Sequence, residues 1–194
     1  SLNDSGIVGN PKQLLLELAS LHQFAELFPL AVQRLAEASS VALVRIWITK
    51  PPLPGDCSSC RFANECSNRE RCLHLVASSG RSLNNSEENW QQVNGAFRRF
   101  PIGVRKVGKI AATGQSLEVA NVEHDHAWVA EPDWIAAERI TSFVGHPLMH
   151  RGEVLGVLGL FARNPPSESC FEWLRMIANH LGAAIANARA MEEI

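Results

Sequence analysis

The spacing of apolar residues changes twice along the chain, and this change constrains the fold most strongly. At both ends, apolar residues recur at steps of three and four, which places them on one face of a helix. Between the ends, segments rich in β-branched and aromatic residues alternate with a period of two, as strands do. Helical ends around a strand-rich centre predict an α/β (α+β) sandwich with an antiparallel sheet.

The N-terminal helical segment begins at Pro11, a residue suited to the first turn of a helix. Its apolar residues follow a heptad-like spacing over Leu14, Leu18, Leu21, Ala25, Phe28, Val32 and Leu35. A proline inside a helix removes a hydrogen bond and clashes with the preceding turn. We therefore expect two helices or a kink at Phe28–Pro29.

The C-terminal segment repeats this spacing from about Ser167 or Ser169 to the last residue. Its apolar positions are Leu174, Ile177, Leu181, Ala184, Ala188 and Met191. Two such seams predict a homodimer formed through the terminal helices. Nothing stops the last helix, so we expect it to lead into a further, output domain. Residues 1–10 are expected to be a disordered leader or a cloning remnant, and 11–194 a single domain.

The central segments predict most of the sheet. Strands are expected at 41–49, 73–78 and 116–122, and a hairpin at 142–149 and 154–162 with its turn at 150–153. Segment 154–162 is apolar on both faces and should lie centrally in the sheet. Short helices are expected at 106–113, closed by Gly114, and at 132–139.

Four of the five cysteines lie within sixteen residues, in the pattern C-x2-C-x5-C-x5-C. They are Cys57, Cys60, Cys66 and Cys72, and they fall in a segment, 51–72, that is rich in turn-forming residues. Thiolates are the usual ligands of structural zinc and of iron–sulfur clusters. The spacing predicts one metal centre in a cysteine-rich insertion loop, with zinc preferred to an iron–sulfur cluster.

Other interpretations of the cysteines stay open. The same four residues could form two disulfides, or could be reduced thiols without a metal. His74 lies two residues after Cys72 and would share its face on a strand, so it could replace one thiolate. Cys170 lies alone near a helix start and is expected to be a small core residue.

Composition excludes several classes of protein. With 194 residues and 46% hydrophobic content, the chain can bury one substantial core. Its net charge is −2 and its basic residues are scattered, which does not indicate a nucleic-acid surface. No apolar run reaches the about 20 residues needed to span a bilayer, and there is no signal peptide. We therefore expect a cytoplasmic domain with no membrane contact.

Three motifs carry a family resemblance: Gly103-Val-Arg-Lys-Val-Gly-Lys-Ile-Ala-Ala-Thr-Gly114, Ser142-Phe-Val-Gly-His-Pro-Leu148 and Gly152-Glu-Val-Leu-Gly-Val-Leu-Gly-Leu160. Together they resemble a GAF domain over about residues 24–190. The cysteine loop running into Cys72-Leu-His-Leu-Val-Ala-Ser78 is similar to N-terminal GAF modules of sigma-54-dependent transcriptional activators, or of sensor histidine kinases. The resemblance implies a sheet of five to six strands, with terminal helices on one face and short helices and loops on the other.

The resemblance also implies a function. It implies a regulatory sensory domain, not an enzyme, that binds a small-molecule effector or a redox or metal signal. The terminal helices would pass that signal to a transcription-activating or kinase output domain. A GAF pocket is expected under residues 121–139. Its expected lining is Trp128, Trp134, Arg139, Phe143 and His146. Two alternatives are a redox enzyme of the free methionine sulfoxide reductase type and a purely structural dimerisation module.

Overall fold

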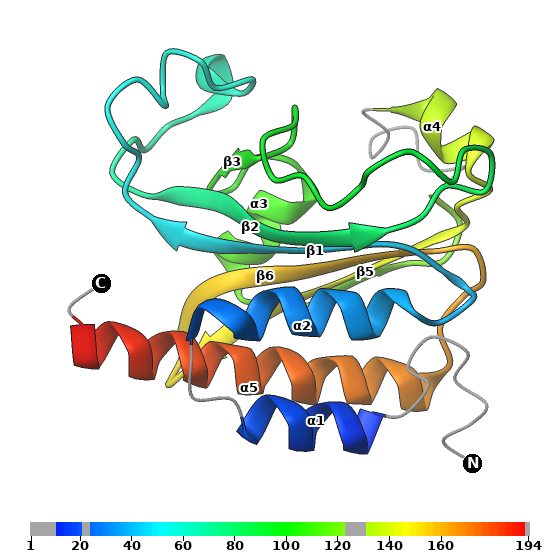
Figure 1. The fold of residues 1–194 in the computed structure, drawn as a ribbon. Coiled ribbons are helices and arrows are strands. Elements are labelled where there is room, and N and C mark those ends of the chain that lie inside the picture. The colour runs from blue at the N-terminus through cyan, green and yellow to red at the C-terminus, as the bar shows by residue number, and fades with distance from the viewer. Residues whose placement is uncertain (1–10, 21–23, 123–130, 193–194) are drawn as a thin grey trace.

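The computed structural model describes residues 11–20, 24–122 and 131–192. Its centre is a six-stranded sheet with the order β3-β2-β1-β6-β5-β4 (Figure 1). Every neighbouring pair of strands is antiparallel. The strands are β1 (Val41–Lys50), β2 (Cys72–Gly80), β3 (Arg99–Pro101), β4 (Leu117–Val119), β5 (Ser142–His150) and β6 (Glu153–Ala162). The predicted fold class, a GAF-like sandwich on an antiparallel sheet, is confirmed.

Three helices lie on one side of the sheet, as Figure 1 shows. They are α1 (Pro11–Ser20), α2 (Phe24–Ala36) and α5 (Glu168–Glu192). The apolar seams of α2 and α5 pack on alternate side chains of the strands, because successive strand residues point to opposite faces, and α1 packs on α2 and α5. The largest fully buried side chains of this core include Leu18, Leu35, Leu158 and Leu174. The core between the helices and the sheet is therefore continuous from the N-terminal to the C-terminal helix.

The opposite face carries two short helices, α3 (Arg105–Thr113) and α4 (Pro132–Ala137), together with long connections (Figure 1). A second apolar core lies here, around Trp47, Phe100, Ile110 and Phe143. Strand β6 contributes to both cores, since Val157 faces the second and Leu158 the first. Its predicted central position is confirmed, because only a strand covered on both sides can bury both faces.

The predicted turns and short helices have the expected local chemistry. The β5–β6 hairpin turns at Arg151 and Gly152, which both adopt left-handed backbone conformations (φ 51° and 81°). Two consecutive left-handed residues are typical of the two-residue turn that matches strand twist. Helix α3 ends at Gly114, whose left-handed conformation (φ 69°) lets its N–H bond the Ile110 carbonyl.

Two elements differ from the sequence-based expectation. The N-terminal helical segment does form two helices, but the first ends at Ser20 and the second begins at Phe24, so Pro29 lies inside α2. The proline is tolerated because it is exposed and its neighbours Leu27 and Phe28 are anchored in the core. Strand β3 was not predicted, since three residues are too few to show a period.

The heptad seams are used within the single chain. Leu14, Leu18, Leu174 and Leu181 are all buried in the core on the helical side of the sheet. A homodimer would have to use other residues of the terminal helices, such as the exposed apolar side chains Leu16, Met176 and Met191. The predicted homodimer stays a prediction.

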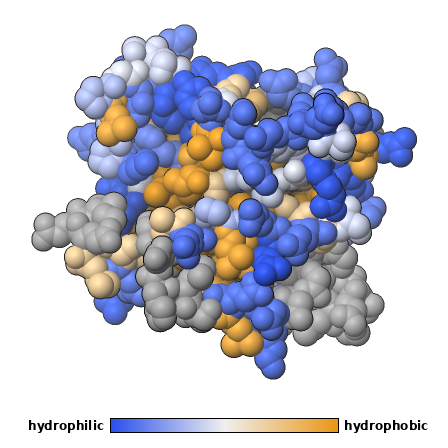
Figure 2. Space-filling model, in the orientation of Figure 1, coloured by the Kyte–Doolittle hydropathy of each residue, from blue (hydrophilic) through white to orange (hydrophobic). Residues whose placement is uncertain are grey.

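The visible surface in one orientation is mainly polar. The face shown in Figure 2 is largely hydrophilic, with smaller hydrophobic patches among the polar residues. Within the described residues, no helix is both long enough and apolar enough to cross a membrane.

Candidate functional site

The cysteine-rich segment forms a loop between β1 and β2, at the end of the sheet where α5 also ends (Figure 1). One aromatic residue, Phe62, anchors it to the second core. The Phe62 side chain is only 2% exposed and stacks on Phe100, with ring centroids 5.1 Å apart. The guanidinium of Arg105 lies over the same ring, 5.4 Å from its centroid. A 3₁₀ turn at Ala63–Glu65 follows this anchor.

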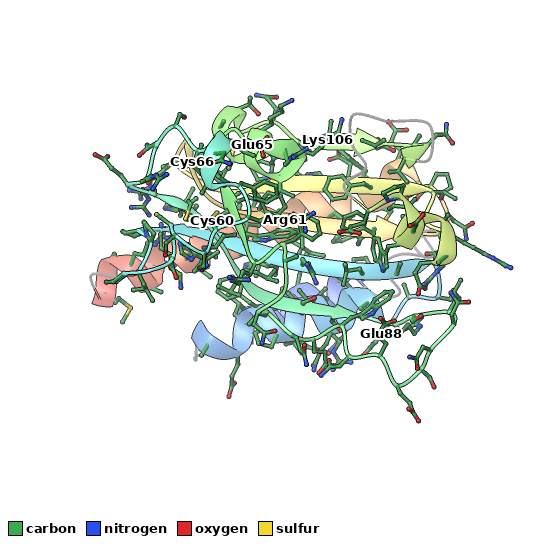
Figure 3. The ribbon with its side chains drawn as sticks, turned by 90° about the horizontal axis from the view of Figure 1, so that it is seen from above. Cys60, Arg61, Glu65, Cys66, Glu88 and Lys106 are labelled. Atoms are coloured by element: carbon green, nitrogen blue, oxygen red, sulfur yellow. The ribbon has the colours of Figure 1, made fainter. Side chains whose placement is uncertain are left out.

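All four clustered cysteines line one small cavity under this loop. The cavity measures about 20 Å³, and Cys57, Cys60, Cys66 and Cys72 all contribute to its wall. Figure 3 shows Cys60 and Cys66 in the loop, at the same end of the molecule. Each of the four side chains is partly buried, and among the described residues none of the four forms a disulfide. The four cysteines therefore share the wall of one cavity.

The four thiols line the same cavity, but their sulfur atoms are not arranged around one central position as metal ligands would be. Within the described residues, no three His, Cys, Asp or Glu side chains are arranged tightly enough to hold a metal ion. Cys66 instead donates to the backbone carbonyl of Asn68 over 3.2 Å. The metal centre predicted from the spacing therefore stays a prediction, for which this cavity is the location.

Cys72 begins strand β2 and contacts His74 on the same face of the sheet. Their Sγ and Nε2 atoms are 3.2 Å apart, and the same Nε2 lies 3.2 Å from the Lys50 carbonyl oxygen. Burial raises the pKa of the Cys72 thiol to about 11, and the neighbouring cysteines add to this effect. Burial also lowers the pKa of His74. His74 is absent from the cavity wall but adjoins Cys72, so its predicted role as a replacement for one thiolate stays a prediction.

Arg99 of β3 fixes the loop over the cavity. It pairs with His74 across the β2–β3 ladder, so its side chain shares that face of the sheet. Its Nη1 donates to the Asp56 carboxylate at 3.0 Å and its Nη2 to the Ser59 hydroxyl at 2.9 Å. The ion pair with Asp56 is largely buried, with side chains 11% and 20% exposed. Arg99 therefore holds both sides of the turn that carries Cys57.

The end of strand β1 connects the loop to helix α5. The Thr49 carbonyl accepts a hydrogen bond from Arg71, which precedes Cys72, at 3.2 Å. It also accepts one from Arg189, in the last turn of α5. Burial lowers the pKa of Arg189, and the like charge of Arg71 lowers it further. One carbonyl thus links the cysteine loop to the C-terminal helix.

The pocket predicted under residues 121–139 is only partly described. Trp128 lies outside the described residues. Trp134 of α4 is half-buried and stands in a row of rings with Trp90 and Phe161, at centroid distances of 5.7 and 5.5 Å. Phe143 is fully buried and joins this row through Phe161 at 4.9 Å. These aromatic residues pack on one another as core.

The other two predicted pocket residues lie elsewhere. Arg139 is exposed, just after α4. His146 was expected beside Phe143, but it points to the opposite face of the sheet, where its ring packs on Phe171 of α5 at 4.5 Å. The expected grouping was wrong because residues three apart on a strand face opposite sides. A second cavity, about 180 Å³ between α2, β2 and the β2–β3 connection, contains none of the predicted pocket residues.

Sequence reasoning missed Asp56, Thr49, Arg99 and Arg189. Asp56 had one local signal, its position directly before Cys57. The other three come from β1, β3 and α5, far apart in the sequence, and only strand pairing and helix packing bring them to the loop. No spacing rule along the chain could have grouped them.

The fold is shared with proteins of known structure. The GAF domain of a phosphoenolpyruvate-protein phosphotransferase (ptsP) from Coxiella burnetii is 20% identical with a TM-score of 0.67, over 97% of this chain and 98% of that one. The A. aeolicus nlh2 GAF domain in an inactive state is 20% identical with a TM-score of 0.62, over 94% and 97% of the two chains. No curated protein sequence matches the chain.

An enzyme also shares this fold. The free methionine-R-sulfoxide reductase from Neisseria meningitidis, in complex with its substrate, is 20% identical with a TM-score of 0.60, over 93% of this chain and 89% of that one. The prediction that the domain is not an enzyme is corrected by this finding, because the same fold carries a reductase.

The family follows from the sequence as well as from the fold. The model of the GAF domain family matches residues 23–185, which span the sheet and the helices on both of its faces. The chain therefore belongs to the GAF domain family.

Proposed function

We propose that this domain is a regulatory sensor, with the β1–β2 cysteine loop as its input and helix α5 as its output. The observation that carries the proposal is the Thr49 carbonyl, which bonds both Arg71 beside the loop and Arg189 of α5. A change in the loop that moves Arg71 alters the second hydrogen bond on the same oxygen. The loop and the C-terminal helix are thereby coupled through two arginines.

The arrangement supports a signal that reaches the thiols. The cysteines line an accessible loop cavity, whereas the described residues predicted for an internal effector pocket, Trp134, Arg139, Phe143 and His146, are packed as core or lie apart. A metal ion or an oxidant is therefore a better supported signal than a small organic effector in that pocket. Thiols in a reducing cytoplasm would be available for either.

The expected receiver is a transcription-activating or kinase domain that follows α5. A GAF domain of similar structure is described in an inactive state, which fits a domain with at least two functional states. In this chain, the change would reach the receiver as a shift between two packings of α5 on the sheet.

Hydrogen exchange tests this coupling without assuming which signal is natural. The loop thiols are alkylated with iodoacetamide, and exchange is measured in peptides from the last turns of α5. Peptide mapping verifies that the buried Cys170 is unmodified. Alkylation should change α5 exchange in the wild type, because the bulky adducts displace the loop and Arg71.

The matched variants are Arg189→Met and Arg175→Met. Both remove a positive charge from α5, but Arg175 is exposed and pairs with Glu172 on the same helix. The response to alkylation should disappear in Arg189→Met and persist in Arg175→Met. Unchanged α5 exchange in the alkylated wild type would refute the proposed coupling.

A thiol-dependent reductase is the second candidate function. The observation in its favour is that four reduced thiols share one cavity. In such a reaction, the sulfoxide becomes a thioether, two cysteine thiols become a disulfide, and the oxygen leaves as water. Turnover of free methionine-R-sulfoxide with dithiothreitol as reductant tests it, and loss of turnover in Cys60→Ser and Cys66→Ser would assign it to this loop.

A further inference from the structure

We propose that Cys57, Cys60, Cys66 and Cys72 bind one thiophilic divalent ion, and that Arg99 donates to its thiolates and compensates their charge. The inference deepens the proposed function, because the ion would be a signal received by the loop.

The size of the cavity favours a single ion. Its volume of about 20 Å³ is close to the about 10–15 Å³ that one water-sized sphere requires. A zinc ion needs space for one atom at the centre of four thiolates, which the side chains would provide by rotating toward the cavity. An iron–sulfur cluster has several atoms and would require the loop to open, so zinc or a similar ion is preferred.

The loop can make these movements. Cys57 and Cys60 lie in one tight turn, in which the Cys60 N–H donates to the Cys57 carbonyl at 3.4 Å. Two thiols three residues apart are a common half-site for zinc. Most residues between Pro51 and Arg71 are exposed, and Phe62 is the one buried side chain among them. Little packing resists a rotation of the thiols toward one another.

Arg99 supplies an unused donor at this cavity. Two of its nitrogen atoms hold Asp56 and Ser59, on the two sides of Cys57. Its third, Nε, is buried and has no hydrogen-bond partner among the described residues. Arg99 itself lines the cavity. Buried N–H groups almost always have an acceptor, and a metal-bound thiolate in the cavity would provide one.

The charges around the cavity also favour a metal ion bound by thiolates. Four thiolates around a divalent cation leave a net negative charge, which a nearby arginine stabilises. Arg99 and Arg69 both line the cavity, and Asp56 is the one acidic residue in its described wall. Arg99 is also fixed by its ion pair with Asp56, so its position does not depend on the ion.

Cobalt titration of the reduced domain provides the test. Co²⁺ should bind with one equivalent, give thiolate-to-cobalt charge-transfer bands together with the visible bands of tetrahedral cobalt, and be displaced by Zn²⁺. Each single Cys→Ser change in the loop should lower the charge-transfer intensity. His74→Ala should leave the number of thiolate bonds unchanged, because His74 does not line the cavity.

The substitution Arg99→Met tests whether Arg99 donates to the metal-bound thiolates. Arg98→Met is the matched control. Arg98 is adjacent, but it donates to the backbone of Asn94 and Gly95 and does not line the cavity. Loss of an outer-shell partner typically weakens metal binding about 10- to 100-fold. We expect a Kd increase in that range for Arg99→Met and little change for Arg98→Met, with circular dichroism confirming that both fold.

The outcomes separate this inference from the proposed function. Cobalt bound without charge-transfer bands, or no binding at micromolar concentrations, would overturn the metal site, whereas α5 could still respond to alkylation. Metal binding without any change in α5 exchange would refute the coupling and leave the site intact. An unchanged Kd in Arg99→Met would overturn the assignment of Arg99.

Discussion

His146 should make the stability of the domain fall steeply on acidification. Its side chain is 1% exposed, and neither ring nitrogen has a hydrogen-bond partner in the described part of the chain. Burial lowers the pKa of His146 to about 4, with Arg175 lowering it further and Glu172 opposing this. The unfolded chain binds a proton near the ordinary pKa of about 6.5. Between these two values, the unfolded state therefore carries more protons than the folded state.

The sign and size of the effect follow from proton linkage. A base whose pKa is lowered in the folded state leaves stability intact above pH 6.5 and reduces it as the pH falls toward 4. Each pH unit between the two pKa values corresponds to about 1.4 kcal/mol. Acidification from pH 7 to pH 4 should thus lower the free energy of unfolding by about 3 kcal/mol through this residue alone.

The substitution His146→Leu isolates the contribution of this histidine to the pH dependence of stability. Leucine suits the site because His146 packs on Phe171 and lies opposite Leu158 in the β5–β6 ladder. At pH 7, the variant should be more stable by about 1 kcal/mol or more, since it removes two buried polar atoms without partners. Its stability should also depend less on pH.

Urea unfolding followed by tryptophan fluorescence at several pH values between 7 and 4 measures both effects. The difference in unfolding free energy between His146→Leu and the wild type should grow by about 3 kcal/mol across this range. Arg175→Gln should reduce the acid loss, because it removes a positive charge near the ring. Parallel pH profiles for wild type and His146→Leu would refute the reasoning.

Three other substitutions test the packing. Glu138→Ala should cost about 3–5 kcal/mol in chemical denaturation, because it leaves the buried Arg163 without its carboxylate partner; the loss should be much smaller in an Arg163→Met background. Gly182→Ala should lower the unfolding free energy by about 1–3 kcal/mol, since the new Cβ would lie 2.3 Å from the Met149 carbonyl oxygen and outweigh the better helix propensity; an unchanged melting temperature would contradict it. Phe62→Ala should release the cysteine loop, seen as faster proteolysis between β1 and β2 with the rest of the domain folded, and equal protease resistance would argue against its role as the anchor.

Much of the secondary structure could be predicted because its causes are local. The hairpin turn was predictable from Gly152 and the end of α3 from Gly114, because glycine adopts the left-handed conformation without steric cost. The central strand β6 was predictable because a continuous apolar run can only be buried on both sides. Pro29 was misjudged because tertiary packing of α2 outweighs a local helix-breaking preference.

For the candidate site, the sequence by itself determined which thiols belong together, because four cysteines within one short loop must lie near each other. Only the tertiary structure decided what surrounds them. Strand pairing places Arg99 beside His74, and packing of α5 places Arg189 on the Thr49 carbonyl. The separation of His146 from Phe143, by contrast, follows from strand alternation, which the predicted strand at 142–149 already implied. Contacts between distant segments depend on how the whole sheet and its helices close together, which no spacing along the chain encodes.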